Sequence, residues 1–394
     1  MDKVLKRIKP SRFESYLIDK IAQQFVNKLK TEHTTPVLGG STAKGTWLRG
    51  DHDVDVFVKF KSEKDISDKL EKLLKEKFSN IQRIHGSRDY FQIRRLFLKF
   101  EIIPILDIKT TKEAKNITDC SPFHVEWIRN HSDEKIRDEI RLLKQFCKAQ
   151  KIYGAETHIK GFSGHVADLL VIYYKSFHNV IKAATKWKEG TVIKFENKIP
   201  KLNESKLSPL IIIDPTEPNR NAAAALSKEK FNRFIEVCKE YLKNPKEDFF
   251  KIKPLELKHI KHKDTIVKIL PKEGKKDIVA TKMLKCYEYL VKELEKYGFK
   301  IEESDFIFND KKPSLIYFEF KTKTLPKTYK HYGPPTNKKS NVKIFQEKHK
   351  NIFKEKGKVY TILERKHTNA KDYLKELLNS NYIKEKVKQI SLIK

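Results

Sequence analysis

The sequence predicts an α+β protein: a small mixed β-sheet with flanking helices, then a helical middle, then a separate α+β module. Three observations carry this prediction. Short β-rich runs at 53–59 and 90–106 lie close together in the first third. Apolar residues recur at helical spacing across 133–151 and 162–183. A strand, helix, strand order then returns within 265–321.

The first part, residues 1–127, has the pattern of a sheet between helices. Residues 3–30 and 65–78 show helical apolar spacing, and 35–40 form a short strand that runs into a Gly-Ser turn. The runs at 53–59 and 90–106 supply the remaining strands, the second as two segments. We therefore expect a compact head with a mixed sheet.

The second part, residues 128–253, is expected to be mostly helical. Besides its two long helices it has a strand at 210–213, four alanines at 222–225 that favour helix, and a further helix at 227–242. The basic segment 254–263 has little periodicity and is predicted to be a linker.

The third part, residues 254–365, carries strands at 265–270 and 314–321 around a helix at 278–297. That order is typical of a ferredoxin-like or RNA-recognition-type fold. The last part, residues 366–394, is rich in lysine and is predicted to be a short basic helical tail.

The charge of the chain points to a polyanionic partner. Its formal net charge is +32, with 84 basic and 52 acidic residues. Heat adaptation could raise the lysine content, but it enriches glutamate as well and explains the net charge less well. The chain has no uncharged apolar stretch long enough to predict a membrane span. Its basic residues are spread along the sequence and are not gathered in one block, so we expect nucleic acid and no membrane partner. Four scattered cysteines without a CxxC pair predict no zinc site and a reduced, cytoplasmic chain.

A pair of acids dominates the candidate chemistry. Asp53 and Asp55 stand two positions apart in a predicted strand, so both carboxylates share one face. Adjacent carboxylates favour a cation between them, and Mg²⁺ prefers such oxygens together with substrate phosphates. Glu101 lies in another apolar strand, either at a solvated edge or as a third ligand. This pattern indicates phosphoryl or nucleotidyl transfer at a metal site.

A glycine-serine turn precedes the acids. Gly40 allows a tight backbone that brings amide groups close to a phosphate, and the Ser41 hydroxyl adds a donor. If the next residues are helical, Lys44 faces the same phosphates one turn later. Such a turn alone is usually only a turn, and the acids that follow it favour the functional interpretation.

Gly-Ser, a spacer, Asp-x-Asp and an acid in a later strand form the signature of the polymerase β nucleotidyltransferase superfamily. The chain resembles the archaeal (class I) CCA-adding enzymes, which are tRNA nucleotidyltransferases, over roughly residues 1–365. The resemblance rests on GSTAKGTWLRG at 40–50, DVDVF at 53–57, CSPFHVEW at 120–127, RLLKQFCKAQKIYGAE at 141–156, GFSGHVADLL at 161–170, DPTEPNRNAAAALS at 214–227 and YGPPTNKKSNVKIF at 332–345.

The resemblance implies roles residue by residue. The paired acids and Glu101, where relatives usually carry aspartate, match the metal ligands. Ser41 and Lys44 match triphosphate-binding positions, and Lys44 replaces a common arginine. The remaining matches contact the nucleotide, hold its triphosphate and sugar, or read the base edge: His124, Lys144, Tyr153 and Arg220. Taken singly, the first three favour a structural or surface role, and Arg220 could cap the preceding loop; their ordered occurrence together favours the functional interpretation.

The resemblance also implies an activity: template-independent addition of C, C and A to the 3′ end of tRNA from CTP and ATP, with two Mg²⁺ ions and release of pyrophosphate. The third and last parts would grip the acceptor and T arms of tRNA. A homodimer is left open, and the shortened tail disfavours it. The alternatives are a poly(A)- or poly(U)-type terminal nucleotidyltransferase of the same superfamily and an inactive RNA-binding relative.

Overall fold

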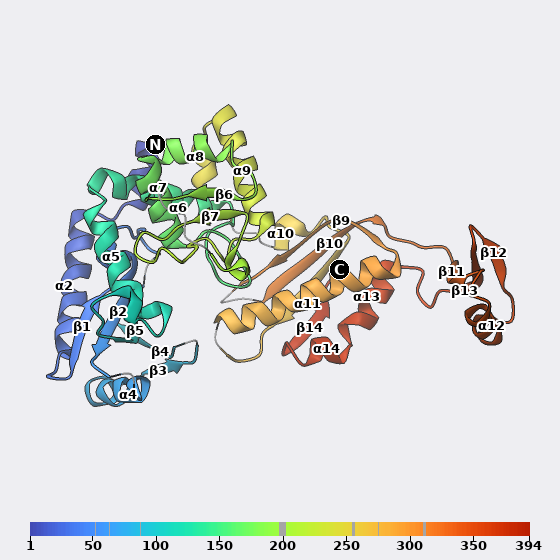
Figure 1. Cartoon of the computed structure of the whole chain (residues 1–394), viewed down its shortest axis with the longest axis horizontal. Coiled ribbons are helices and arrows are strands. Elements are labelled where there is room, and N and C mark those ends of the chain that lie inside the picture. Colours follow the sequence, from blue (N-terminus) through green and yellow to red (C-terminus); the bar gives the residue numbers. More distant parts are fainter. Residues whose placement is uncertain are drawn as a thin grey trace. The chain divides into compact units, whose positions relative to one another are not determined.

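The computed structural model describes residues 1–51, 53–62, 64–86, 88–196, 202–253, 257–274, 276–309 and 313–394 (Figure 1). They form two compact units, Met1–Lys253 and Pro254–Lys394. The boundary that we predicted between residues 127 and 128 falls inside the first unit. None of the helices in the described ranges is both long and apolar enough to cross a membrane.

A five-stranded mixed sheet with the order β1-β2-β5-β4-β3 forms the centre of the head. Only β2 and β5 are parallel; the other neighbours are antiparallel. The strands are β1 (Thr34–Leu38), β2 (Val54–Phe60), β3 (Gln82–Ile84), β4 (Tyr90–Arg95) and β5 (Leu98–Leu106). The predicted mixed sheet, with 90–106 divided into two strands, is confirmed.

The helices α2 (Arg12–Leu29) and α4 (Ile66–Lys77) share a core with this sheet, and the short α3 (Gly40–Lys44) contacts β2. The first helix, α1 (Asp2–Ile8), packs instead on the helical middle of the unit. Phe25 of α2 stacks on Phe100 of β5 with ring centroids 4.0 Å apart. The single helix predicted over 3–30 is wrong, because the helix is interrupted at Pro10. Ser11 and Glu14 then form a capping box that starts α2.

The middle of the first unit is largely helical, as predicted: α5 (Ser121–Asn130), α6 (Glu134–Ala149), α7 (Gly164–Tyr174), α8 (Phe177–Ala184), α9 (Lys228–Lys243), the 3₁₀ turns η1 (Thr111–Glu113), η2 (Ile117–Cys120), η3 (Glu204–Lys206) and η4 (Glu247–Phe250), and the parallel strands β6 (Thr191–Ile193) and β7 (Leu210–Ile212). The helix predicted over 162–183 divides at Lys175, which has a left-handed φ of 68°. The alanines at 222–225 form a turn and not a helix, because Ala222 donates its N–H to Ile212 across the chain.

The second unit contains a four-stranded antiparallel sheet with the order β14-β8-β10-β9. Its elements are α10 (Leu257–Ile260), β8 (Thr265–Leu270), α11 (Lys276–Tyr297), β9 (Lys300–Ile307), β10 (Ser314–Thr322), α13 (Ala370–Leu378), α14 (Asn381–Lys384) and β14 (Gln389–Leu392). The sequence β-α-β-β-α-β is the ferredoxin-like arrangement that we predicted. The predicted linker begins outside the described residues, and its described part includes α10.

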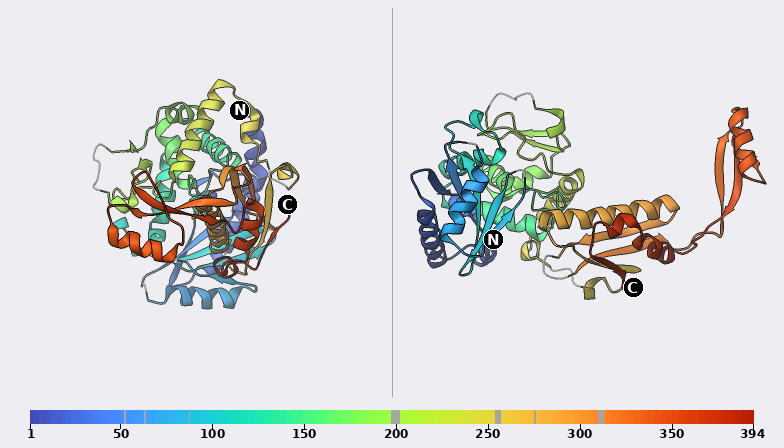
Figure 2. Two further views of the ribbon diagram at one scale, coloured as in Figure 1. Left: turned by 90° about the vertical axis from the view of Figure 1, so that its right-hand side faces the viewer. Right: turned by 90° about the horizontal axis from the view of Figure 1, so that it is seen from below.

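The last residues are not a purely helical tail. Leu374 and Leu378 of α13 lie in the same core as Leu290 of α11, and β14 pairs with β8 along Gln389–Leu392. They complete the ferredoxin-like fold as its second helix and fourth strand. Between β10 and α13 the chain inserts a small lobe with β11 (Thr328–Pro335), α12 (Lys339–Lys348), β12 (Phe353–Glu355) and β13 (Lys358–Glu364), in which α12 packs on β11 (Figure 2).

Candidate functional site

Three carboxylates lie together on one face of the head sheet. Asp55 of β2 is the direct register partner of Glu101 in the parallel strand β5, and Asp53 stands just before β2. Their strand neighbours Val54 and Phe100 are fully buried on the opposite face. The alternation of side chains along each strand therefore places all three acids on one face of the sheet.

The acids repel one another and attract cations. Burial, with Glu101 and Asp53 nearby, raises the pKa of Asp55 to about 7. The ammonium group of Lys99 bridges the cluster, with Nζ 2.6 Å from Asp53 Oδ2 and 3.0 Å from Glu101 Oε1. Gln92 of β4 donates to Glu101 Oε1 at 2.8 Å. A cation already sits against this hard-oxygen donor set, so these residues fit a divalent metal such as Mg²⁺.

The glycine-serine turn lies directly against the acids. Gly40 has a left-handed φ of 55°, and a Cβ atom added to it would stand 1.6 Å from Asp55 Oδ2. Gly39 donates its N–H to the Asp55 carbonyl at 2.8 Å, and Thr42 Oγ1 donates to the Asp53 carbonyl at 3.3 Å. Ser41 follows in α3. The turn therefore fixes the backbone that carries both acids.

A Gly40→Ala substitution tests this contact. We expect at least about a 100-fold loss of kcat, because the methyl group must displace the Asp55 carboxylate. Gly50→Ala is the matched control: Gly50 also has a positive φ, 74°, but no atom lies within 4 Å of its added Cβ. Backbone strain of about 1 kcal/mol is common to both variants. Equal losses of kcat in the two variants would contradict the importance of the Asp55 contact.

Behind the turn, two buried lysines share one buried carboxylate. Asp168 of α7 lies 2.9 Å from Lys44 Nζ and 2.8 Å from Lys144 Nζ. Lys144 also donates to Thr46 Oγ1 at 2.8 Å. Burial lowers the pKa of Lys144, whereas Asp168 opposes that shift. Lys144 is therefore an enclosed cation and does not belong to a solvated helix face.

Tyr153 borders the same cluster. Its hydroxyl oxygen would be 2.9 Å from a Cβ added to Gly164, at the start of the helix that carries Asp168. Burial raises the pKa of Tyr153, so its hydroxyl stays protonated at neutral pH. Lys148 Nζ lies 4.9 Å from the centre of the tyrosine ring.

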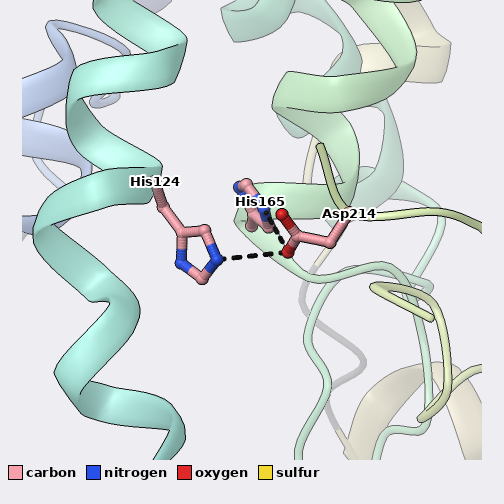
Figure 3. A group of neighbouring side chains, drawn as sticks. All are labelled: His124, His165 and Asp214. Atoms are coloured by element: carbon pink, nitrogen blue, oxygen red, sulfur yellow. Dashed lines mark hydrogen bonds and ion pairs between the residues drawn. The ribbon is translucent and has the colours of Figure 1, made fainter. Parts of the chain in front are cut away.

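A second cluster gathers around the buried Asp214, which follows β7 (Figure 3). Its Oδ2 atom lies 3.1 Å from His124 Nε2 on α5, 3.2 Å from His165 Nε2 on α7 and 2.9 Å from Arg220 Nη1. The two imidazole rings point at the carboxylate from different helices, with ring centroids 4.4 Å apart. Asp214 thus connects both histidines to Arg220.

The charges in this cluster are set by its packing. Burial, followed by the charge of Lys44, lowers the pKa of His165 to about 4, so the ring is neutral at pH 7. Burial would raise the pKa of Asp214, but hydrogen bonds from His124 and His165 lower it far below its ordinary value. The ligand atoms of the two histidines and Asp214 lie within 4.8 Å of one another, as a metal site requires. The guanidinium group of Arg220 already lies against Asp214 and His124. We therefore interpret the cluster as a set of residues that positions Arg220.

The structure therefore places the predicted residues in three neighbouring groups of the same unit. The first holds Asp53, Asp55, Glu101, Gly40 and Ser41, the second holds Lys44, Lys144 and Tyr153 beside Asp168, and the third holds His124 and Arg220 around Asp214. Sequence reasoning missed Lys99, His165, Asp168 and Asp214. Lys99 stands two positions before Glu101 in the same strand, a spacing that could have identified it.

Three family models match successive parts of the chain. They are "Nucleotidyltransferase domain" at residues 18–124, "tRNA nucleotidyltransferase, second domain" at 138–251 and "CCA-adding enzyme, C-terminal domain" at 267–390. The CCA-adding enzyme of Saccharolobus shibatae is 34% identical over 95% of this chain and 91% of its own length. This chain belongs to the CCA-adding enzyme family. A second relative, the CCA-adding enzyme of Sulfurisphaera tokodaii, is 33% identical over 93% of this chain and 89% of its own length.

The membership confirms the resemblance and the fold class predicted from sequence. The match to the C-terminal family model reaches residue 390, well beyond the limit near 365 that we predicted. A solved cytoplasmic RNA terminal U-transferase shares the fold of this family member with a TM-score of 0.51 and 14% identity, over 64% of this chain and 97% of that one.

Proposed function

We propose that this CCA-adding family member adds C, C and A to the 3′ end of tRNA from CTP and ATP, without a template and with release of pyrophosphate. The observation that carries the proposal is the register pairing of Asp55 with Glu101 beside Asp53, directly against the Gly40 turn. Family membership supports tRNA as the substrate and nucleotidyl transfer as the reaction.

The chain's own residues prepare this reaction. Two Mg²⁺ ions held by Asp53, Asp55 and Glu101 would activate the RNA 3′-hydroxyl and neutralise developing charge on the triphosphate. Lys44 and Lys144 bind the triphosphate, and Asp168 fixes both ammonium groups before a nucleotide arrives. Ser41 adds a hydroxyl donor, and Tyr153 borders the sugar. The 3′-hydroxyl then attacks the α-phosphate in line with the departing pyrophosphate.

Arg220 selects the base in this proposal. Asp214 fixes its guanidinium, and His124 Nε2 lies 3.4 Å from Arg220 Nη1. A fixed donor pair suits the Watson–Crick edge of cytosine or adenine, whose ring nitrogens accept hydrogen bonds. Uracil or guanine would leave polar groups unpaired there, and such mismatches reject a substrate strongly.

The parts of the chain divide the work in the same proposal. Residues 1–127 catalyse, 128–253 select the nucleotide, and 254–365 with 366–394 grip the acceptor and T arms through shape and phosphates. The net charge of +32 supports an RNA partner. We propose a cytoplasmic enzyme.

The test uses a tRNA transcript that lacks its terminal CCA, with Mg²⁺ and each of CTP, ATP, UTP and GTP singly and in pairs. Two additions with CTP alone, and a third only when ATP is present, are the expected result. Long homopolymer tails would show a poly(A)- or poly(U)-type transferase. Salt-sensitive binding of the transcript without any addition would show an inactive RNA-binding relative.

Arg220→Ala tests base selection. We expect kcat/KM for CTP to fall about 10- to 100-fold while the KM for tRNA stays within twofold, because in this proposal the guanidinium contacts the nucleotide and not the tRNA. The preference for CTP over UTP should narrow as well. Arg220→Lys keeps the charge without the planar fork and should recover little of the preference. Unchanged discrimination in both variants would remove Arg220 from base selection.

A further inference from the structure

A two-residue turn with exposed apolar side chains joins β4 to β5. Leu96 is 75% exposed and Phe97 is 65% exposed. Leu96 also has a left-handed φ of 55°, a conformation that asparagine or glycine adopts with less strain. Single exposed apolar residues are common on protein surfaces. Here two exposed apolar residues are adjacent at a hairpin tip, and the backbone of Leu96 is strained. This combination suggests a functional role, and the position of the tip relative to the acids indicates which one.

The hairpin runs from the acids outward to this tip. Gln92 pairs with Glu101, Arg94 with Lys99 and Arg95 with Leu98. Ile93, Leu98 and Phe100 are buried on the core face, so Arg94 and Lys99 share the face of the acids, whereas Arg95, the partner of Leu98, lies on the other face at the tip. Phe97 precedes Glu101 by four residues, about 13 Å along a strand. That is the length of about four stacked nucleotides.

The charge around the tip has one sign. Residues 90–100 contain Arg94, Arg95 and Lys99 and no acidic residue. Lys99 is neutralised by Asp53 and Glu101. No ion pair to Arg94 or Arg95 occurs among the residues that the structure describes. Two basic groups beside an exposed aromatic ring are what a polynucleotide strand binds, through phosphates and base stacking.

We propose that this hairpin tip, defined as Arg94, Arg95, Leu96 and Phe97, holds the tRNA strand whose 3′ end reaches the acids. The proposal rests on the proposed function, since only a nucleic acid substrate brings a polynucleotide strand to this face of the sheet. Phe97 stacks on a base or on the end of the acceptor helix, and Leu96 supports that contact. Arg94 binds a phosphate on the face of the acids, and Arg95 binds one from the other side of the tip. The tip thus positions the growing RNA end and leaves the incoming nucleotide untouched.

The first test is the double variant Leu96→Asn/Phe97→Ser in the full chain, assayed on a tRNA transcript without CCA. Asparagine tolerates the left-handed backbone at 96, so the fold is retained. We expect the KM for tRNA to rise about tenfold, with the KM for CTP within twofold of wild type. The matched control is Phe13→Ser/Tyr16→Ser on α2, which removes two side chains that are 72% and 61% exposed and should change neither constant.

The second variant, Arg94→Gln/Arg95→Gln, separates phosphate contacts from stacking. In direct binding of the same transcript, the slope of log affinity against log salt should become shallower by about 1.4–1.8. Equal effects on tRNA and CTP would overturn the proposal, as would an unchanged KM for tRNA. Sedimentation of wild type and the apolar double variant tests a second copy as the occupant, and a dimer lost only in the variant would also overturn it.

The binding assay keeps this proposal separate from the proposed function. If wild type adds no nucleotides but binds the transcript, and the hairpin variants weaken that binding, CCA addition is refuted and the tip proposal stands. Wild type that adds CCA with unaltered kinetics in both hairpin variants would refute the tip alone.

Discussion

An Asp55→Asn variant is expected to lose at least about 1000-fold in nucleotide addition while its fold is retained. The lost carboxylate is the most enclosed member of the acid group, paired in register with Glu101 and touching Gly40. Losing the metal ligand that we propose here removes several kcal/mol of transition-state stabilisation. Primer extension with CTP at saturating Mg²⁺ measures the effect.

The same variant should be more stable than wild type without divalent metal. The folded pKa of Asp55 is raised from 3.8 to about 7, so the folded state binds this proton more tightly than the unfolded state does. Wild type therefore loses stability as pH rises from about 4 to about 7, and the asparagine variant lacks that loss. We expect the variant to gain on the order of 1–3 kcal/mol at pH 8 and much less at pH 5.

Asp107→Asn is the matched control, since Asp107 is an acid at the far end of β5 that pairs with Lys59. It should change neither nucleotide addition nor the pH dependence of unfolding. Added Mg²⁺ should raise the melting temperature of wild type and of the control but not that of Asp55→Asn. A metal response that persists in Asp55→Asn would place the metal elsewhere.

The acid group could be predicted because its geometry is local. Side chains at i and i+2 of a strand share a face, and Glu101 interrupts an apolar strand. Pairing of β2 with β5 was the one long-range fact needed, and it brings Asp55 opposite Glu101. Lys99 lies within that same local pattern, two positions before Glu101, but it was not among the predicted site residues.

The residues that hold the cations could not be predicted in this way. Asp168 is separated by 124 residues from Lys44, and Asp214 is 49 residues from His165. Local spacing alone favoured a solvated helix face for Lys144. It is buried only because α7 brings a carboxylate to it, and a compensating charge from another helix leaves no periodic signal in the sequence.

The C-terminal strand was missed for a related reason. Gln389–Leu392 is short and follows a lysine-rich run, so its own composition favours neither a strand nor a core position. Its stability comes from pairing with β8, more than 100 residues earlier in the chain, where Ile390 meets Ile269. Edge strands formed by such pairing depend on tertiary structure more than on propensity.

The second large effect is expected for Asp168→Asn, which leaves the ammonium groups of Lys44 and Lys144 buried without a counter-charge. Removing one partner from a buried ion pair typically costs about 3–5 kcal/mol, because the remaining charge stays desolvated. For a unit of this size, that corresponds to a melting temperature roughly 8–15 °C lower. Thermal unfolding followed by circular dichroism measures it, and the KM for CTP should rise in parallel.

Two comparisons decide whether the lost negative charge of Asp168 causes the loss of stability. Glu189→Gln removes an acid from the exposed pair with Lys228 and should cost less than about 1 kcal/mol. Adding Lys144→Met to Asp168→Asn removes one of the two uncompensated cations, so stability should partly return even though nucleotide addition stays low. A double variant that is less stable than Asp168→Asn would show that Lys144 stabilises the fold through Thr46 and its packing. In that case Asp168 would act mainly on Lys44, and the triphosphate site would rest on one lysine instead of two.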